Sequence, residues 1–497
     1  MLSGNNFKKN TPTDTTFGVL DFDRSPGFFL NLGMTSTHFN FPSFSQKETL
    51  VEQDNLSYMP GWNNTFSTEA LPGALPLGQN TPQKCAYGLY AEQLQGTAFT
   101  APRSSNQRVW FYRIRPSVVH DAFENYTANE QFSPLNPNKI DLGRVVTPKQ
   151  LRWRPPKKPQ SNEKVDFVDG LRILAGSGSP QLKTGFAILQ YQFNTSMHNR
   201  CMCNSDGDFL FVPEQGELLI TTECGKLRVK PKEICVIPRG IKFSVAFALE
   251  NETFARGYMS EVYSGHFVIP DLGPIGANGL ANPRDFLHPV AWYEDRDQDV
   301  TFEIIQKFQN QYFVAKCAHS PFDVVAWHGN YAPYKYDLRL FNVINSVSYD
   351  HLDPCIFTVL TCQTLEKGTA VLDFVIFPPR WSVQEHSFRP PYYHRNTMNE
   401  YMGLIEGKYE AKEDGFVPGG GSLHNCMIPH GPEEKVFEKA SNAELKPERV
   451  AEGSLAFMFE SVFMINPTEY YMWDVEIDQN YNQCWSGIKK HFNPNKM

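Results

Sequence analysis

The stretch from residue 204 to residue 249 constrains the fold of this chain more than any other part. It contains five short apolar runs, at residues 209–212, 218–220, 227–229, 234–237 and 243–247. Short segments that contain Pro or Gly separate these runs and mark turns between them. Apolar runs of this length at such close spacing indicate a β-sandwich or a β-barrel.

A second group of apolar runs lies nearer the C-terminus, at residues 356–360, 371–377, 401–405 and 456–458. The chain shows no heptads and no short-period repeat, so a coiled coil or a solenoid is not indicated. The sequence therefore predicts a mainly β fold class with two related β units and a few short helices. One of these helices is expected between Asp478 and Phe492.

These two groups of runs predict three parts of the chain. Residues 1–57 are rich in Ser, Thr, Asn and Phe and show no sustained period, which predicts a variable N-terminal extension. Residues 58–338 are expected to form an N-terminal β domain, and residues 339–497 a C-terminal β domain. The sequence assigns no role to the extension.

Composition and charge exclude several classes of function. The 497 residues include 46 Lys and Arg against 54 Asp and Glu, a net charge of −8, whereas nucleic-acid binding needs a basic face. No window approaches the roughly 20 apolar residues of a membrane-spanning helix. None of the ten cysteines forms a CxxC pair, and no apolar segment of the secretory kind opens the chain. We therefore expect a cytoplasmic protein with reduced thiols and without nucleic-acid or membrane partners.

Candidate metal ligands gather in the C-terminal part of the chain, in the order His394, Glu400, His424 and His430. Six positions separate His394 from Glu400, so a helix would turn the two side chains to different faces. On one straight strand they would lie about 20 Å apart. They can share a metal only if the chain bends or reverses between them, and the intervening Asn396 favours a turn.

Two imidazoles and one carboxylate are a ligand set that leaves coordination positions open. Non-haem Fe(II) oxygenases use this set. Catalytic zinc also binds two histidines and a glutamate, so the ligand types alone do not decide the metal. The residues also fit a plainer interpretation, in which scattered histidines are satisfied by hydrogen bonds and bind no metal.

The spacing His394-x5-Glu400-x6-Gly407 resembles the end of the first metal motif of cupins. A Pro-Gly-Gly segment followed by His424 and His430 resembles a looser version of the second motif. The corresponding stretch of the N-terminal unit has no histidine at the ligand positions. We therefore expect that unit to be a scaffold and the C-terminal unit to carry the metal.

Seven longer segments form a more specific pattern than the ligand spacing. They are residues 89–94 (LYAEQL), 204–209 (NSDGDF), 270–286, 326–331 (AWHGNY), 390–396 (PPYYHRN), 419–424 (GGGSLH) and 429–432 (PHGP). Together they resemble the homogentisate 1,2-dioxygenases, from about Tyr58 to about Pro494. The resemblance implies two β units of the cupin or jelly-roll type, with the metal in the second.

The resemblance also implies roles for individual residues. His394, Glu400 and His430 are implied to hold Fe(II). His351, inside the segment SYDH, is implied to be the catalytic base. The residue types alone give no reason to prefer His351 to His328, which lies between a Trp and a Gly.

The implied reaction cleaves the ring of homogentisate, a hydroquinone with an acetate side chain. Both atoms of O2 enter the substrate and give 4-maleylacetoacetate, in tyrosine and phenylalanine catabolism. Tyr409, His424 and His430 are implied to contact the substrate, and the family assembles as a hexamer, a dimer of trimers. Two rival hypotheses stay open: a zinc-dependent cupin isomerase or hydrolase, and a non-catalytic bicupin used for storage or scaffolding.

Overall fold

The computed structural model describes residues 54–126, 144–271, 273, 278–350, 356–366, 368–412 and 415–496. These residues form thirty strands and two α-helices, which confirms the mainly β fold class. The helices are α1 (Glu434–Ser441) and α2 (Glu469–Trp473), with the 3-10 helices η2 (Ala86–Gly88), η3 (Pro283–Asp285), η4 (Leu338–Leu340) and η5 (Tyr481–Trp485). In the described ranges, none of the helices has the length and apolar character needed to cross a bilayer.

The largest sheet has nine strands and occupies the middle of the fold. In spatial order they are β1 (Tyr58–Pro60), β17 (Leu287–Pro289), β21 (Tyr334–Asp337), β13 (Glu233–Ile237), β10 (Asp208–Gln215), β15 (Ala255–Val262), β8 (Thr184–Phe193), β7 (Leu171–Ser179) and β30 (Asn466–Pro467). All eight residues of β15 are buried. A strand that is covered on both faces needs a nearly continuous apolar run, which explains the unbroken run at residues 209–212 in β10.

One face of this sheet packs on a seven-stranded sheet. Its strands are β12 (Gly225–Val229), β11 (Leu218–Thr222), β14 (Lys242–Phe247), β9 (Arg200–Asn204), β18 (Phe302–Phe308), β19 (Gln311–Cys317) and β5 (Glu124–Asn125). Phe209 and Phe211 of β10 share a core with Ile220 of β11 and Phe243 of β14. The Phe211 and Phe243 ring centroids are 5.9 Å apart. The sandwich expected for residues 204–249 is therefore present, and each of its five apolar runs lies in a strand.

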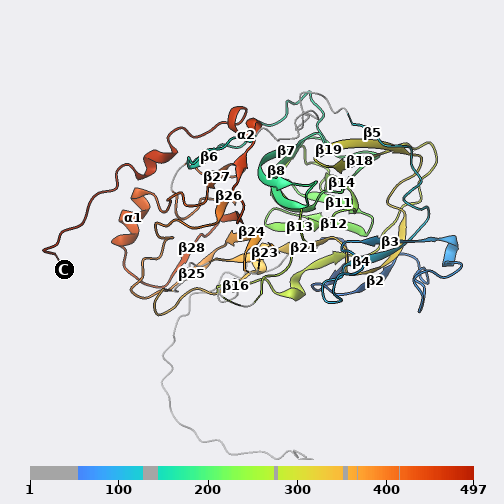
Figure 1. Ribbon diagram of the computed structural model, residues 1–497, viewed down its shortest axis with the longest axis horizontal. Helices are drawn as coiled ribbons and strands as arrows, with labels where there is room; N and C mark the ends of the chain where they lie inside the picture. The colour runs from blue at the N-terminus through green and yellow to red at the C-terminus, as the bar shows by residue number, and fades with distance from the viewer. Residues whose placement is uncertain are drawn as a thin grey trace, which may run out of the picture. The chain divides into compact units, whose positions relative to one another are not determined.

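The other face of the nine-stranded sheet packs on a six-stranded sheet. That sheet consists of β23 (Thr358–Gln363), β24 (Ala370–Phe377), β29 (Leu455–Ser461), β26 (Asn399–Glu406), β27 (Gly421–His424) and β6 (Leu151–Trp153). Successive side chains of a strand point to opposite faces, so Leu210 and Val212 of β10 enter this second core. The ring of Tyr258 meets that of Phe457 at 4.9 Å. Figure 1 shows the orange strands of the six-stranded sheet beside green strands of the central sheet.

Three smaller sheets complete the described fold. Four strands, β2 (Phe66–Glu69), β20 (Val324–Gly329), β4 (Arg108–Arg113) and β3 (Tyr90–Gln95), form one of them. The others are the pairs β16 (Gly279–Leu280) with β22 (Asn342–Val343), and β25 (Arg380–Ser382) with β28 (Glu448–Val450).

Strand β6 belongs to a sheet whose other strands come from beyond residue 357. It pairs antiparallel with β27, so that Trp153 lies opposite Gly421. Trp153 is fully buried, and its ring stacks on Tyr471 with centroids 4.0 Å apart. Its indole N–H donates to the Tyr471 carbonyl at 2.8 Å. A segment of the N-terminal half thus completes the sheet of the C-terminal half.

The prediction of a helix between Asp478 and Phe492 is wrong. That stretch contains only the five-residue 3-10 helix η5. Asp478 accepts a hydrogen bond from the Asn480 N–H and pairs with Arg152 at 2.7 Å, which fixes the chain before η5. Tyr481 then turns inward and is almost fully buried. Tertiary contacts therefore override the weak helical pattern of this segment.

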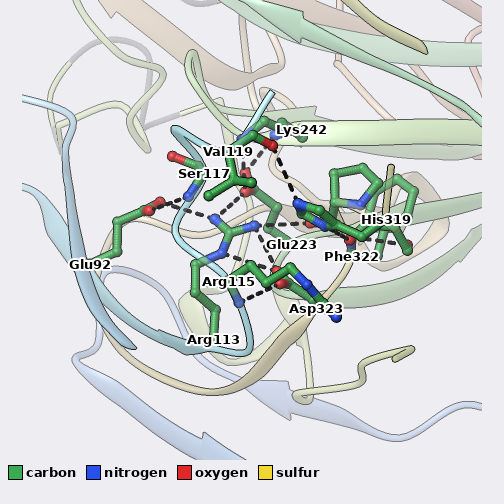
Figure 2. Close-up of polar contacts among 12 residues, drawn as sticks. Glu92, Arg113, Arg115, Ser117, Val119, Glu223, Lys242, His319, Phe322 and Asp323 are labelled. Carbon is green, nitrogen blue, oxygen red and sulfur yellow. Dashed lines mark hydrogen bonds and ion pairs between the residues drawn. The ribbon is translucent and has the colours of Figure 1, made fainter. Parts of the chain in front are cut away.

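A cluster of buried charged side chains links the four-stranded sheet to the turn between β11 and β12. The Arg113 guanidinium pairs with Glu92 and Glu223 at 2.9 Å and with Asp323 at 2.8 Å. Figure 2 shows this guanidinium between the three carboxylates, with Lys242 on the far side of Glu223. Burial opposes ionisation of Glu223, but the charges of Lys242 and Arg113 outweigh it and lower the pKa of that carboxyl.

We expect Arg113→Ala to lower the free energy of unfolding by about 3–5 kcal/mol, because it leaves buried carboxylates without their partner. Chemical denaturation would measure the change. Arg115→Ala is the matched control, since Arg115 is partly exposed and pairs with the exposed Asp295 and Asp297. Its loss should cost about 0–1 kcal/mol. Equal denaturation midpoints for the two variants would contradict a stabilising role of the cluster.

Candidate metal centre

A turn before β26 places His394 near Glu400. The Asn396 side chain accepts a hydrogen bond from the Met398 N–H at 2.7 Å, which is the local bond of an Asx turn. Its amide group donates to Glu400 Oε1, also at 2.7 Å. β26 begins at Asn399, so Glu400 sits at the start of a strand of the six-stranded sheet. The chain bend required between His394 and Glu400 is therefore present.

His430 reaches the same place through a backbone pairing with His394. The two residues form an antiparallel bridge in which each N–H donates to the other carbonyl, at 3.0 and 3.1 Å. His430 Nε2 lies 3.0 Å from Glu400 Oε2, and His394 Nε2 lies 3.7 Å from Glu400 Oε1. One donor atom from each of the three residues lies within 4.8 Å of the others.

Both imidazoles are oriented by the same kind of outer hydrogen bond. His394 Nδ1 lies 2.7 Å from the Tyr392 carbonyl, and His430 Nδ1 lies 2.9 Å from the Ile428 carbonyl. A carbonyl can only accept, so each Nδ1 carries a proton and each Nε2 faces Glu400. That nitrogen donates to the carboxylate when it is protonated and offers its lone pair to a metal when it is not. Metal-binding histidines are oriented in this way in metalloproteins.

The three side chains fit a divalent metal. Two ligands about 2.1 Å from one ion and at right angles to each other are about 3 Å apart. The separations of 3.0 and 3.7 Å between imidazole nitrogens and carboxylate oxygens are close to this value. Burial opposes ionisation of Glu400, but hydrogen bonds from His394 and His430 outweigh it and hold its pKa well below the usual range. The carboxylate therefore stays charged, as a metal ligand must.

The sheet register sets Glu400 in a row of ionisable side chains. His424 of β27, Glu400 of β26, Glu460 of β29 and Asp373 of β24 are opposed residues on neighbouring strands. Opposed residues project from the same face of a sheet. Burial raises the pKa of Asp373 to about 6 and that of Glu460 well above its ordinary value. Glu400 differs because two imidazoles face it.

The structure brings His424 to the three candidate ligands. Its ring stacks on that of His430 with centroids 4.4 Å apart and an angle of 7°. Its Nε2 lies 2.6 Å from the Tyr481 hydroxyl. Burial lowers the pKa of His424 well below its ordinary value, so the imidazole is neutral.

Tyr409 lies in a buried aromatic cluster after β26. Its ring contacts those of Phe377 and Phe416, with centroids 5.3 and 6.2 Å apart. Burial raises the pKa of the Tyr409 phenol, the charge of Glu410 adds to this effect, Arg380 opposes it, and Glu400 makes a smaller contribution that also raises it. The phenol of Tyr409 is therefore neutral.

Of the other two histidines singled out in the sequence, the structure describes only His328. His351 lies outside the described residues. His328 lies on β20 of the four-stranded sheet, where its Nε2 is 3.1 Å from the Tyr112 hydroxyl. The sequence also gave no reason to choose Lys412 and Tyr481, although both are buried beside His424. Lysines and tyrosines are common on surfaces, and neither residue lies in a recognisable motif.

Comparison with known proteins places the site in a family. Residues 57–338 match the family model described as homogentisate 1,2-dioxygenase N-terminal, and residues 339–492 match the corresponding C-terminal model. The homogentisate 1,2-dioxygenase of Caenorhabditis elegans is 57% identical over 450 residues, covering 89% of this chain and 99% of the relative. That of Homo sapiens is 56% identical over 447 residues, covering 88% and 98%.

One solved structure shows a much weaker similarity. A cupin 2 conserved barrel domain protein from Leptotrichia buccalis aligns with a TM-score of 0.26 and 8% identity, over 62% of this chain and 92% of that chain. The assignment therefore depends on the two family models and the sequence relatives. They cover almost the whole described chain, including the strands and turns that carry His394, Glu400 and His430. This chain belongs to the homogentisate 1,2-dioxygenase family.

Proposed function

We propose that this protein is a ring-cleaving dioxygenase that inserts both atoms of O2 into homogentisate and gives 4-maleylacetoacetate. This reaction belongs to tyrosine and phenylalanine catabolism. The observation that carries the proposal is the convergence of His394, Glu400 and His430 within one site. The chain that supplies this site is 55–57% identical to named homogentisate 1,2-dioxygenases over 88–89% of its length.

The metal that we propose for this site is Fe(II), held by His394, Glu400 and His430. Three protein ligands on one side leave coordination positions for other molecules, which is the arrangement of non-haem Fe(II) oxygenases. When bound, ferrous iron supplies the one-electron chemistry that lets triplet O2 react with a closed-shell phenol. Zinc accepts the same ligand types, so metal analysis must distinguish the two ions.

The protein's own residues would bind the substrate and move its proton. A phenol has a pKa near 10, so a hydroxyl of homogentisate carries its proton at neutral pH. We assign the removal of that proton to the imidazole of His351, on the resemblance alone. Tyr409, His424 and His430 are proposed to contact the substrate and fix which ring bond is presented for cleavage.

Oxygen uptake by the reconstituted enzyme tests the proposed reaction. The protein would be purified without oxygen, loaded with Fe(II) and mixed with homogentisate. We expect one O2 consumed for each homogentisate and formation of the ring-opened product. The same protein loaded with zinc should take up no oxygen. Activity with zinc in the absence of oxygen would favour an isomerase or hydrolase, and failure to retain any metal would favour a non-catalytic bicupin.

We also propose a homo-hexamer, built as a dimer of trimers, that works in the cytoplasm without nucleic-acid or membrane partners. The support is the family resemblance together with the acidic composition of the chain, whose net charge is −8. Multi-angle light scattering would measure the mass of the particle. A mass of one, two or three chains at micromolar concentration would contradict the hexamer.

Tyr409→Phe is expected to weaken the use of homogentisate by about 1–3 kcal/mol in kcat/KM, the cost of leaving a buried polar partner unsatisfied. The substitution removes one hydroxyl and keeps the ring that packs on Phe377 and Phe416. Iron content and thermal stability should therefore stay close to those of the parent. Steady-state oxygen uptake would measure the effect, and an unchanged kcat/KM would remove Tyr409 from the substrate site.

The parent enzyme should also recognise the acetate side chain of its substrate. A site that hydrogen-bonds a substrate group discriminates strongly against analogues that lack it. We therefore expect lower kcat/KM for hydroquinone and for gentisate than for homogentisate. Equal values for the three compounds would show that the side chain is not recognised.

A further inference from the structure

Lys412 is a buried lysine that is linked to His424 through Tyr481. Its side chain is 5% exposed, and its Nζ hydrogen-bonds the Tyr481 hydroxyl. It also lies over the Tyr481 ring, 4.5 Å from the centroid. Among the described residues, no carboxylate lies within ion-pair distance of this Nζ. A buried cation without a carboxylate partner is costly, so its position calls for an explanation.

Two acidic side chains in this region pair with another cation. Glu433 and Asp478 pair with Arg152, at 3.3 and 2.7 Å. The Arg152 guanidinium also lies over the Tyr481 ring, 4.4 Å from its centroid. The side chains of Arg152 and Lys412 therefore both contact the Tyr481 ring. Among the described residues, the hydrogen-bond partner of Lys412 Nζ is the Tyr481 hydroxyl. Burial lowers the pKa of Lys412 to about 7, so a nearby negative charge would favour its ammonium form.

The two hydrogen bonds that link Lys412 to His424 through Tyr481 have defined donors and acceptors. Lys412 Nζ donates to the Tyr481 oxygen, and in its ammonium form it can only donate. The Tyr481 hydroxyl then has its own proton left for His424 Nε2, which lies 2.6 Å away. An imidazole that accepts at Nε2 carries its proton at Nδ1. The chain from Lys412 through Tyr481 therefore fixes the tautomer of His424.

The other ring nitrogen of His424 has no hydrogen-bond partner among the residues that the structure describes. Nδ1 is buried and makes no hydrogen bond within the described residues. An unsatisfied buried donor is expensive to keep, and groups of this kind occur at functional sites. His424 lies opposite Glu400 on the neighbouring strand, so both side chains project from the same face. This N–H therefore lies beside the proposed metal ligands without an acceptor from the described part of the chain.

We propose that Lys412 and Tyr481 are positioning residues that hold His424 with its proton on Nδ1, so that this N–H binds an anionic oxygen of the substrate. The inference rests on the proposed ring-cleavage function and adds two residues to its site. Homogentisate carries two kinds of group with such an oxygen: the acetate carboxylate and a phenol that becomes negative when it loses its proton. The negative charge that the substrate brings also gives the buried Lys412 ammonium a partner at longer range.

The test measures anaerobic binding to the iron-loaded enzyme, so that turnover is not needed. Tyr481→Phe removes the link between Lys412 and His424 but keeps the ring that packs on Trp485. We expect the Kd of homogentisate to rise about tenfold, the usual effect of leaving one buried hydrogen-bonding group unsatisfied. Iron content should not change. Lys412→Met should weaken binding by a similar factor.

A double substitution separates positioning from a general structural role. Because Lys412 acts through Tyr481, adding Lys412→Met to Tyr481→Phe should weaken binding little further. Tyr471→Phe is the matched control, since it removes a buried hydroxyl that bonds only to Tyr401 among the described side chains. That variant should bind homogentisate like the parent. Fully additive losses, or equal losses in the control, would overturn the inference.

The choice of ligand identifies the oxygen that His424 binds. Hydroquinone keeps the phenols of homogentisate and lacks its carboxylate. If the N–H binds the carboxylate, Tyr481→Phe weakens homogentisate only, whereas binding to a phenol oxygen predicts the same loss for both. An unchanged Kd for both ligands overturns the inference. If the parent enzyme itself fails to bind homogentisate, the proposed function fails instead.

Discussion

Glu400→Ala is expected to remove most of the bound iron and nearly all ring cleavage together. Glu400 supplies the only carboxylate of the candidate ligand set, and both imidazoles face it. Without it, the two imidazoles that remain carry no negative charge to offset the charge of a divalent cation. Even loss of an outer hydrogen-bonding partner typically costs 10–100-fold in metal affinity or activity, and a direct ligand is expected to cost more. Iron analysis after gel filtration and oxygen uptake measure the two losses.

Glu406→Ala is the matched control, because Glu406 lies at the end of the same strand. Its carboxylate pairs with Lys232 at 2.8 Å, and both side chains are about one-third exposed. Removing it deletes the same chemical group without touching the ligand set. Iron content and oxygen uptake should match the parent. If Glu400→Ala kept full iron and full turnover, the metal centre would have to lie elsewhere.

His351→Ala is expected to keep the iron and to lose turnover by about 10²–10⁴-fold. That range is the usual contribution of a positioned general base. His351 is not among the three proposed ligands, so metal binding should not depend on it. Single-turnover oxygen uptake, together with iron analysis of the same sample, separates the two quantities. Parallel loss of iron and activity would make His351 a ligand or a structural residue instead.

His328→Ala provides the comparison for the base. The sequence could not rank these two histidines, but the structure pairs His328 with Tyr112 on a different sheet from Glu400. The substitution should therefore leave turnover close to the parent value. A 100-fold loss in His328→Ala, with normal turnover in His351→Ala, would exchange the two assignments.

Short apolar runs in the sequence predicted the strands well, because each run depends only on residues that are close together in the chain. The run at residues 209–212 lies in β10, and the run at residues 371–377 lies in β24. Both strands are buried on two faces, so apolar runs of strand length identify them directly. The bend between His394 and Glu400 was also predictable, since Asn396 forms its turn with residues close in sequence.

The rest depends on contacts between residues far apart in the chain. Nothing local shows that Tyr481 turns inward to meet His424, 57 positions earlier. The same inward turn ends the helical pattern that we expected for this segment. Lys412 follows a strand in a segment that reads as a solvated turn, and its burial depends on Tyr481. Periodicity describes elements of structure, and it carries no information about which elements meet.

The pairing of β6 with β27 affects how this protein folds during synthesis and whether its two parts can be produced as separate fragments. We propose a domain boundary between residues 338 and 339, yet the partner of Leu151 in the sheet is Leu423. The chain must be synthesised almost to its end before this edge can close, and such distant pairing folds slowly. Until then the edge of β27 and the place for Trp153 stay open to other strands. A C-terminal fragment that begins at residue 339 would keep that open edge permanently and should aggregate, whereas adding residues 144–159 as a separate peptide should restore its solubility.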